Sequence, residues 1–312
     1  MADAIIDSLT AANLFNLTGV VAVVTGGGTG IGLMISSALV ANGATVYIIG
    51  PSQADLDKVS KTYSDAAASK PGRGKMYGLE GDIRQKTEAK RLADEIGRRE
   101  KYITILFNNA GVLSGRFTRP TSGNPSAADY VQTLFDGVSQ EDFAHNLNTN
   151  AVGPYWLSVA FLPLLEKWKL SGEPVAKRFA PQIVMTSSMN GWTKDAATAG
   201  FSFPYMFSKS AIGHFTSSLA RELLPLGVRV NGIAPGFFIT EMTAPGTKDD
   251  SGSSRLPDGQ KTPFEIPVKP EAGAGTARDM GALALFLTAN MYMSGETVLI
   301  DGGTLLKHPS SY

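Results

Sequence analysis

Two residues four positions apart could act together on a proton: Tyr205 and Lys209, in the stretch "FPYMFSKSA". Residues at i and i+4 lie one above the other on a helix, so a phenol and an ammonium group can share one partner there. A nearby positive charge lowers a phenol's pKa from about 10 and makes the group a better acid and base at neutral pH. On spacing alone, a tyrosine packed beside a solvated lysine is the simpler explanation, so the surrounding sequence must decide.

A glycine-rich stretch, "TGGGTGIG" at residues 25–32, directly follows an apolar run. Glycines let the backbone turn sharply and approach a pyrophosphate, and the N-terminus of a following helix offers unpaired N–H groups and a positive dipole. A glycine-rich match alone is a weak signal. Its place between a strand and a helix favours dinucleotide binding over a simple tight turn.

Apolar, β-branched runs alternate with amphipathic stretches along the whole chain. The expected strands are residues 19–25, 44–50, 75–82, 103–109, 182–188, 228–234 and 297–301, and the expected helices are 30–42, 53–68, 86–99, 142–169, 205–224 and 277–289. This alternation predicts an α/β fold with a parallel sheet covered by helices on both faces. We expect one Rossmann-like, doubly wound domain of about seven strands over residues 1–312, because no repeat or linker divides the chain.

Two stretches interrupt the alternation, at residues 112–141 and 242–276. Both are too long for ordinary connections in such a fold. Both follow strands at their carboxyl ends, where open α/β sheets bind ligands. We expect lid-like insertions beside the substrate, and insertions without a function are the alternative.

The composition excludes several classes of function. The 28 basic and 28 acidic residues give a formal net charge of zero, so no nucleic-acid or anionic-membrane surface is expected. The absence of cysteine excludes a disulfide framework and a thiolate metal site, and the three histidines are too scattered for a metal site. The N-terminus carries acids and has no long apolar run, so a cytoplasmic protein is expected.

Further motifs follow the glycine-rich stretch in a fixed order. The stretch 25–32 resembles the nucleotide-binding fingerprint of the short-chain dehydrogenase/reductase family. The resemblance continues through "GDI" (81–83), "NNAG" (108–111), "NTNAVG" (148–153), "SSMNG" (187–191), "YMFSK" (205–209), "APGFFITEM" (234–242) and "SGETVLIDGG" (294–303). The matches cover nearly the whole chain, and they favour a reactive pair at Tyr205 and Lys209.

The resemblance implies a catalytic set and no metal. Its members are Asn150, Ser188, Tyr205 and Lys209. Tyr205 would exchange a proton with the substrate oxygen, and Ser188 would orient that oxygen. Lys209 would hold the nicotinamide ribose and lower the pKa of Tyr205, and Asn150 would hold a water of a proton relay. Ser187 and Asn148 are close enough in sequence to be confused with Ser188 and Asn150.

The resemblance also implies a nicotinamide cofactor, which would carry the redox chemistry. The implied cofactor-binding residues are Gly26, Thr29, Gly30, Ile31, Gly32, Ser52, Asp82, Ile83, Asn109, Ala110, Gly111, Tyr205, Lys209, Pro235, Gly236, Ile239 and Thr240. Asn109 could instead only satisfy backbone groups, and Ile239 could contribute only packing or main chain.

The end of the second expected strand departs from the family's pattern. Gly50 stands where an acid would favour NAD, and neither Thr29 nor Pro51 supplies the arginine that would favour NADP. Without the acid, nothing repels a 2′-phosphate, and Ser52 and Gln53 could donate neutral hydrogen bonds to it near a helix N-terminus. We therefore expect NADP(H) to be modestly favoured over NAD(H).

The implied activity is the NAD(P)H-dependent interconversion of a ketone and a secondary alcohol. Aromatic residues in and beside the long loops could either form a pocket for a bulky apolar carbonyl, such as a 3-oxoacyl or natural-product intermediate, or pack the loops onto the body: Trp192, Phe201, Phe203, Phe237 and Phe238. The alternative is a cofactor-binding non-redox enzyme or regulatory protein on the same scaffold. The long apolar segment 143–168 and the helix 205–224 resemble the two helices that pair subunits in this family, so a homodimer or homotetramer is expected.

Overall fold

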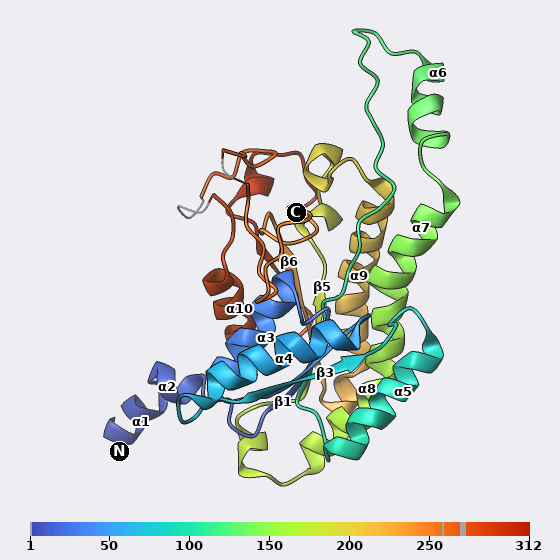
Figure 1. The fold of residues 1–312 in the computed structure, drawn as a ribbon. Coiled ribbons are helices and arrows are strands. Elements are labelled where there is room, and N and C mark those ends of the chain that lie inside the picture. The colour runs from blue at the N-terminus through green and yellow to red at the C-terminus, as the bar shows by residue number, and fades with distance from the viewer. Residues whose placement is uncertain (1, 258, 269–272) are drawn as a thin grey trace.

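A single parallel sheet organises the computed structural model, which describes residues 2–257, 259–268 and 273–312 (Figure 1). Its strands are β1 (Val21–Thr25), β2 (Thr45–Gly50), β3 (Lys75–Glu80), β4 (Ile105–Asn108), β5 (Gln182–Thr186), β6 (Arg229–Pro235) and β7 (Thr297–Ile300). They lie in the order β3-β2-β1-β4-β5-β6-β7, and every neighbouring pair is parallel. The predicted seven-stranded Rossmann-like sheet is confirmed, with its switch point between β1 and β4.

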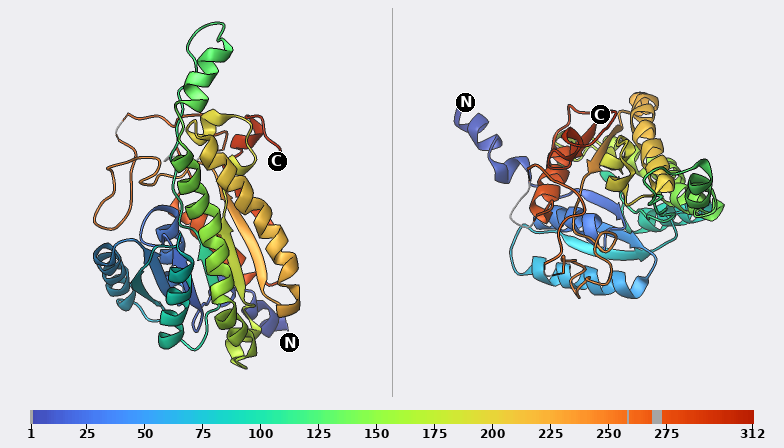
Figure 2. Two further views of the ribbon diagram at one scale, coloured as in Figure 1. Left: turned by 90° about the vertical axis from the view of Figure 1, so that its right-hand side faces the viewer. Right: turned by 90° about the horizontal axis from the view of Figure 1, so that it is seen from above.

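Helices cover both faces of the sheet, as predicted (Figure 2). One hydrophobic core contains residues of α3 (Gly30–Ala41), α4 (Gln53–Ala68) and α10 (Ala277–Ala289), and the other contains residues of α5 (Lys86–Arg99), α8 (Gly153–Leu170) and α9 (Phe203–Glu222). Along β1, Ala22 and Val24 face the first core while Val21 and Val23 face the second. This two-sided burial explains the continuous apolar runs of the strands.

The predicted helix 142–169 is wrong as a single element. The structure instead has α7 (Gln140–Leu147), a π-helical turn at Asn148–Val152 and then α8. Pro154 lacks the N–H that an unbroken α-helix would use at the start of α8. Such π-helical turns occur frequently at functional sites, and this one carries Asn150.

The two long insertions differ from each other. Residues 112–141 include α6 (Ala127–Tyr130) and a π-helical turn at Val131–Phe135, which project away from the body (Figure 1). Residues 242–276 contain no helix or strand among their described positions. The expected lid over 112–141 is therefore limited to the start of that segment, because its outer half does not lie over the sheet.

The remaining elements are short. The chain begins with α1 (Ala2–Ser8) and α2 (Ala11–Leu14), which were not predicted and contain no buried residue. Single 3-10 turns lie at Pro174–Lys177, Met189–Gly191, Ala196–Ala199, Leu224–Leu226 and Thr304–Leu306. Among the helices that the structure describes, none is both long and apolar enough to cross a membrane.

Candidate active site

A pocket of about 960 Å³ lies at the carboxyl edge of the sheet. Residues that end or follow β1, β4, β5 and β6 line it, among them Gly26, Asn109, Thr186 and Pro235. This volume is near the upper end of the range for small-molecule sites. The pocket can therefore hold part of a cofactor together with a substrate.

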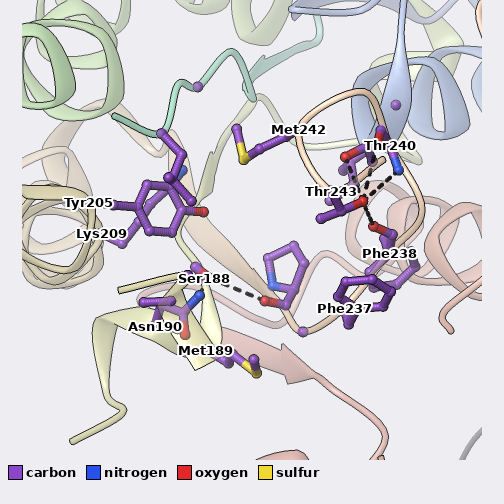
Figure 3. A pocket seen from close by; sticks show the side chains of 18 of the residues that line it. Ser188, Met189, Asn190, Tyr205, Lys209, Phe237, Phe238, Thr240, Met242 and Thr243 are labelled. Atoms are coloured by element: carbon purple, nitrogen blue, oxygen red, sulfur yellow. Dashed lines mark hydrogen bonds between the residues drawn. The ribbon is translucent and has the colours of Figure 1, made fainter. Parts of the chain in front are cut away.

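Helix α9 carries Tyr205 and Lys209 into this pocket. Ser202 caps the helix, since its hydroxyl accepts the backbone N–H of Tyr205 at 3.2 Å. Tyr205 is 7% exposed and Lys209 is 4% exposed, so both lie on the buried face of α9. The Tyr205 hydroxyl points into the pocket on the side where Ser188 lies (Figure 3).

The protonation of this pair is governed mainly by burial. Burial raises the pKa of Tyr205, and a hydrogen bond with the Ser188 hydroxyl lowers it in part. Burial lowers the pKa of Lys209 from 10.5 to about 8. The expected lowering of the Tyr205 pKa by Lys209 is not found. The Lys209 ammonium donates to the Thr186 carbonyl at 2.8 Å and lies 5.7 Å from the centroid of the Tyr205 ring.

The geometry separates the two neighbouring serines. Ser188 accepts the backbone N–H of Asn190 at 3.1 Å and donates to the Pro235 carbonyl at 3.3 Å, within the pocket (Figure 3). The Ser187 hydroxyl donates instead to the Lys209 carbonyl at 2.8 Å. Ser187 therefore fixes α9 to the end of β5, while Ser188 lies beside Tyr205.

Asn150 is buried in the π-helical turn and braces the wall beside Lys209. Its side-chain oxygen accepts the Val112 N–H at 2.8 Å, and its amide donates to the Val112 carbonyl at 2.9 Å and to Ser208 at 2.9 Å. Asn148, the other candidate, is exposed. A side chain on Gly111 would begin 3.3 Å from the Asn150 oxygen and 3.4 Å from the Lys209 ammonium nitrogen, so these groups converge on Gly111.

The glycine-rich loop forms a cradle that fits the pyrophosphate of a dinucleotide. Gly26 and Gly30 have φ angles of +62° and +51°, which favour glycine. A Cβ on Gly32 would lie 2.0 Å from the Gly26 carbonyl oxygen, so no side chain fits there. Thr29 is the N-cap of α3 yet forms no side-chain hydrogen bond to the described residues of the first turn. The N–H groups of that turn can therefore bind an anion.

The other side of the cradle is held by Asn109 and its neighbours. Asn109 donates its side-chain amide to the Thr25 carbonyl at 3.1 Å, and the backbone N–H groups of Asn109 and Ala110 both donate to the Thr25 hydroxyl at 3.0 Å. Asn109 thus satisfies backbone groups, one of the two roles left open by the sequence. Ala110 packs so tightly that its Cα would lie 2.9 Å from a Cβ on Gly26.

The N-terminus of α4 is more fully occupied than the sequence indicated. Ser52 accepts the Asp55 N–H at 3.4 Å, and the Glu80 carboxylate accepts the Gln53 N–H at 3.2 Å. The Gln53 amide donates to Asp57 at 2.7 Å and to the Gly78 carbonyl at 3.3 Å. The expectation that Gln53 could donate to a 2′-phosphate is therefore wrong for this arrangement, because these donors are already used.

Two of the implied cofactor-binding residues, Asp82 and Ile83, lie after β3. Asp82 accepts two hydrogen bonds from the Arg84 guanidinium, at 2.8 and 2.7 Å, and these bonds hold the pKa of its carboxyl below the usual value. Ile83 is buried, and its carbonyl oxygen would lie 2.7 Å from a Cβ on Gly153. Neither residue lines the main pocket.

The segment after β6 closes the cradle from the opposite side. Thr240 lies against Gly30, where a Cβ would be 3.0 Å from the Thr240 methyl carbon. Gly236 packs against Asp301, whose Cα would lie 2.5 Å from a Cβ there. Ile239 packs against the small cluster of Phe237, Ile266 and Ala274, so its contribution is packing.

Comparison with known proteins identifies the family. Residues 20–251 match the family model described as "short chain dehydrogenase". The chain belongs to the short-chain dehydrogenase/reductase family.

Two fungal members of this family are similar to the chain over nearly its full length. The short-chain dehydrogenase/reductase VdtF of Byssochlamys spectabilis is 34% identical, covering 98% of this chain and 99% of VdtF. PhomF of Diaporthe leptostromiformis is 35% identical, covering 100% of both chains. The solved structure "Pseudomonas aeruginosa RhlG/NADP active-site complex" has a TM-score of 0.69 at 27% identity, covering 93% of this chain and 98% of that one.

The structure divides the aromatic residues of this short-chain dehydrogenase/reductase into two groups. Phe237 and Phe238 line the pocket. Phe117 stacks on Phe203 and meets Phe201 edge to face, with ring centroids 5.0 and 5.8 Å apart. Trp192 packs against Tyr312. The aromatic residues outside the pocket therefore hold the insertions and the C-terminal segment to the body. Of the two roles left open by the sequence, pocket lining applies to Phe237 and Phe238, and packing applies to the others.

Several pocket residues of this family member were not singled out from the sequence. They include Arg116, His145, Met189, Met242, Leu256 and Phe264. The 242–276 stretch was expected to reach the substrate, but its lack of periodicity gave no signal for individual positions. Arg116 lies in the insertion 112–141, and His145 lies in α7 just before the π-helical turn. The sequence did not predict the path of the chain at either place.

Proposed function

We propose that this chain is an NADP(H)-favouring oxidoreductase that interconverts a ketone and a secondary alcohol. The main support for this proposal is the position of the Tyr205 hydroxyl and Ser188. They share one wall of a pocket that continues to the glycine-rich loop (Figure 3). In this proposal the catalytic residues are Asn150, Ser188, Tyr205 and Lys209. The cofactor-binding residues are those named from the sequence, with Gly32, Ala110 and Ile239 acting through packing.

The proposed mechanism follows from the positions of these groups. The glycine-rich loop and Lys209 would hold a nicotinamide cofactor, which would supply the hydride for reduction of the carbonyl carbon. Ser188 would turn its hydroxyl proton from the Pro235 carbonyl to the substrate oxygen and orient that oxygen toward Tyr205. Because burial keeps Tyr205 protonated at neutral pH, its hydroxyl can give its proton to that oxygen. The Lys209 ammonium would bind the ribose hydroxyls of the cofactor, and Asn150 fixes the backbone at Val112 beside it.

The pocket supports a bulky apolar carbonyl as the substrate. Its apolar lining includes Met189, Phe237, Phe238, Met242 and Phe264. This chemistry suits a 3-oxoacyl or natural-product intermediate better than a small polar ketone. A panel of aryl, polycyclic and 3-oxoacyl ketones, with loss of reduced-cofactor absorbance as the signal, tests the proposal. Tight cofactor binding with no ketone reduced would favour the non-redox or regulatory alternative.

We expect NADPH to bind about tenfold more tightly than NADH, which corresponds to about 1.4 kcal/mol. Gly50 carries no charge that would repel the 2′-phosphate of NADPH. The Ser52 hydroxyl can donate its proton to that phosphate while it accepts the Asp55 N–H. The preference is small because Glu80 already places a carboxylate at the N-terminus of α4. Fluorescence titration of both reduced cofactors measures it. Glu80→Gln should increase the preference, while equal affinities would show that this turn does not read the phosphate.

We propose a homodimer or homotetramer that pairs through α8 and α9. Tyr155, Val159 and Phe207 are large apolar residues exposed on these helices, and Phe207 is 59% exposed. Burying such residues against a second copy removes apolar area from water. Phe207→Asp should therefore shift the mass measured by light scattering toward the monomer. Ile6→Asp, at a position 65% exposed on α1, is the matched control, and a wild-type monomer at micromolar concentration would contradict the proposal.

A further inference from the structure

One part of the long loop after β6 leaves the substrate pocket and lies elsewhere. Pro245 and Leu256 both line the pocket, but none of residues 246–255 does. We call this excursion the strap. It reaches the side of the molecule where α4 lies, as the orange segment beside that blue helix shows (Figure 2).

Gly252 is the point where the strap meets the glycine-rich loop. It is buried, and a Cβ built on it would lie 2.6 Å from the Gly28 carbonyl oxygen and 2.9 Å from the Leu33 side chain. The same Cβ would lie 3.7 Å from Val59 of α4. The φ angle of Gly252 is +84°, a conformation that other residues rarely adopt. Only glycine therefore allows this close approach.

The strap reaches Gly28 as a preformed turn. The Asp249 N–H donates to the Ser253 carbonyl at 2.8 Å, and the Gly252 N–H donates to the Asp249 carbonyl at 3.0 Å. The Asp249 carboxylate accepts the N–H groups of Ser251 and Ser253 at 2.9 and 3.1 Å. The Asp249 carboxylate therefore has its hydrogen-bond partners within the turn itself.

A second contact joins the strap to α4. The Lys58 ammonium lies 2.6 Å from the Asp250 carboxylate, with side chains 55% and 94% exposed. Such an exposed pair contributes little to stability and is screened by salt. It orients the strap, whereas the packing of Gly252 sets its position. Since Thr240 lies against Gly30, the loop touches the glycine cradle at two points, Gly28 and Gly30.

We propose that the strap, residues 246–255, forms the outer wall of the cofactor site at its phosphate and adenosine end. In open α/β folds the pyrophosphate lies at the N-terminus of the first helix, and the adenosine extends toward the second strand. The strap touches that part of the glycine-rich loop, so it must move before a bound cofactor can leave. Because the same loop lines the substrate pocket, cofactor exchange is coupled to the substrate side. This inference rests on the proposed cofactor site.

The decisive variant is Gly252→Ala, with Gly259→Ala as its matched control. Both glycines lie in the same loop at similar φ angles, +84° and +78°, so both substitutions strain the backbone alike. A Cβ at Gly259 meets no described atom within 4 Å, whereas a Cβ at Gly252 meets Gly28. We expect NADPH to dissociate about tenfold faster from Gly252→Ala in stopped-flow fluorescence. Gly259→Ala should stay within about twofold of wild type.

Limited trypsin digestion gives a readout that needs no activity. Lys248 and Arg255 are the cleavage sites within the strap, and both are exposed. NADPH should protect both sites in the wild type and in Gly259→Ala, but not in Gly252→Ala. Should Gly252→Ala fail to fold, Lys58→Met tests the second contact of the strap, the ion pair with Asp250. It should speed cleavage at Arg255, while Lys61→Met, which removes an ion pair within α4 alone, should not.

The outcomes separate this inference from the proposed function. Equal NADPH dissociation from both glycine variants, or slower dissociation from Gly252→Ala, overturns the strap as an outer wall. Cleavage of the strap at equal rates with and without NADPH also overturns it. If the wild-type protein binds neither NADPH nor NADH, the proposed function fails as well.

Discussion

Tyr205→Phe should lower turnover by about 10²–10⁴-fold while NADPH affinity stays within about twofold of wild type. The substitution removes only the hydroxyl, which points into the pocket beside Ser188 (Figure 3). The ring can keep its place because the backbone of Tyr205 is held by the Ser202 cap. The loss should therefore appear in the proton-transfer step and leave the binding of the cofactor intact. Steady-state kinetics on the best ketone of the panel, with a parallel NADPH titration, measure both quantities.

Tyr292→Phe is the control for this prediction. Tyr292 is fully exposed after α10 and lies outside the pocket, so its loss of a hydroxyl should leave turnover unchanged. If Tyr205→Phe turns over ketone at the wild-type rate, Tyr205 is not the proton donor. That result would favour a non-redox use of the scaffold.

Lys209→Met should abolish most activity and also change how stability depends on pH. Burial lowers the pKa of Lys209 from 10.5 to about 8 in the folded protein. Between these values the unfolded chain binds more protons than the folded one, so the free energy of unfolding rises with pH. At 1.36 kcal/mol for each pKa unit, the rise is about 3 kcal/mol between pH values of about 8 and 10.5. Below about pH 8, Lys209 is charged in both the folded and the unfolded protein. The full cost of burying that charge then lowers the free energy of unfolding.

Urea unfolding of the ligand-free protein measures this difference. Wild type should gain about 3 kcal/mol over Lys209→Met across that pH range. At neutral pH the methionine variant should be the more stable of the two, because it buries no charge. Lys90→Met, at a surface ion pair on α5, should follow the wild-type pH dependence. The same pH dependence in wild type and Lys209→Met would show that the buried ammonium does not titrate near 8.

The strands and the glycine cradle could be predicted because their signals are local. The central strands are short, largely apolar runs, as in β1, whose five residues are all buried. The turn at 25–32 requires glycine for reasons that act within a few residues, such as the approach of Gly32 to the Gly26 carbonyl. Local constraints of this kind are visible in the sequence. The order of the motifs also indicated the family to which the chain belongs.

Positions set by distant contacts could not be predicted. The resemblance named Ser188, with Ser187 close enough in sequence to be confused with it. Only the packing of α9 against β5 assigned Ser187 to the Lys209 carbonyl. The phenylalanines are chemically alike, yet Phe201 and Phe203 pack on Phe117 while Phe237 and Phe238 line the pocket. Residue type does not encode these choices, because they depend on where separate segments meet.

The sequence by itself determined the parallel α/β fold, the glycine cradle and the residue types available for proton transfer, since these depend on periodicity and on short-range backbone geometry. Only the tertiary structure decided how those groups are tuned. The spacing of Tyr205 and Lys209 indicated an electrostatic effect of the ammonium on the phenol. Burial instead dominates both pKa values, because packing removes water and directs the ammonium to the Thr186 carbonyl. The contact of Gly252 with Gly28 was likewise hidden, because it joins two segments that only the folded chain brings together.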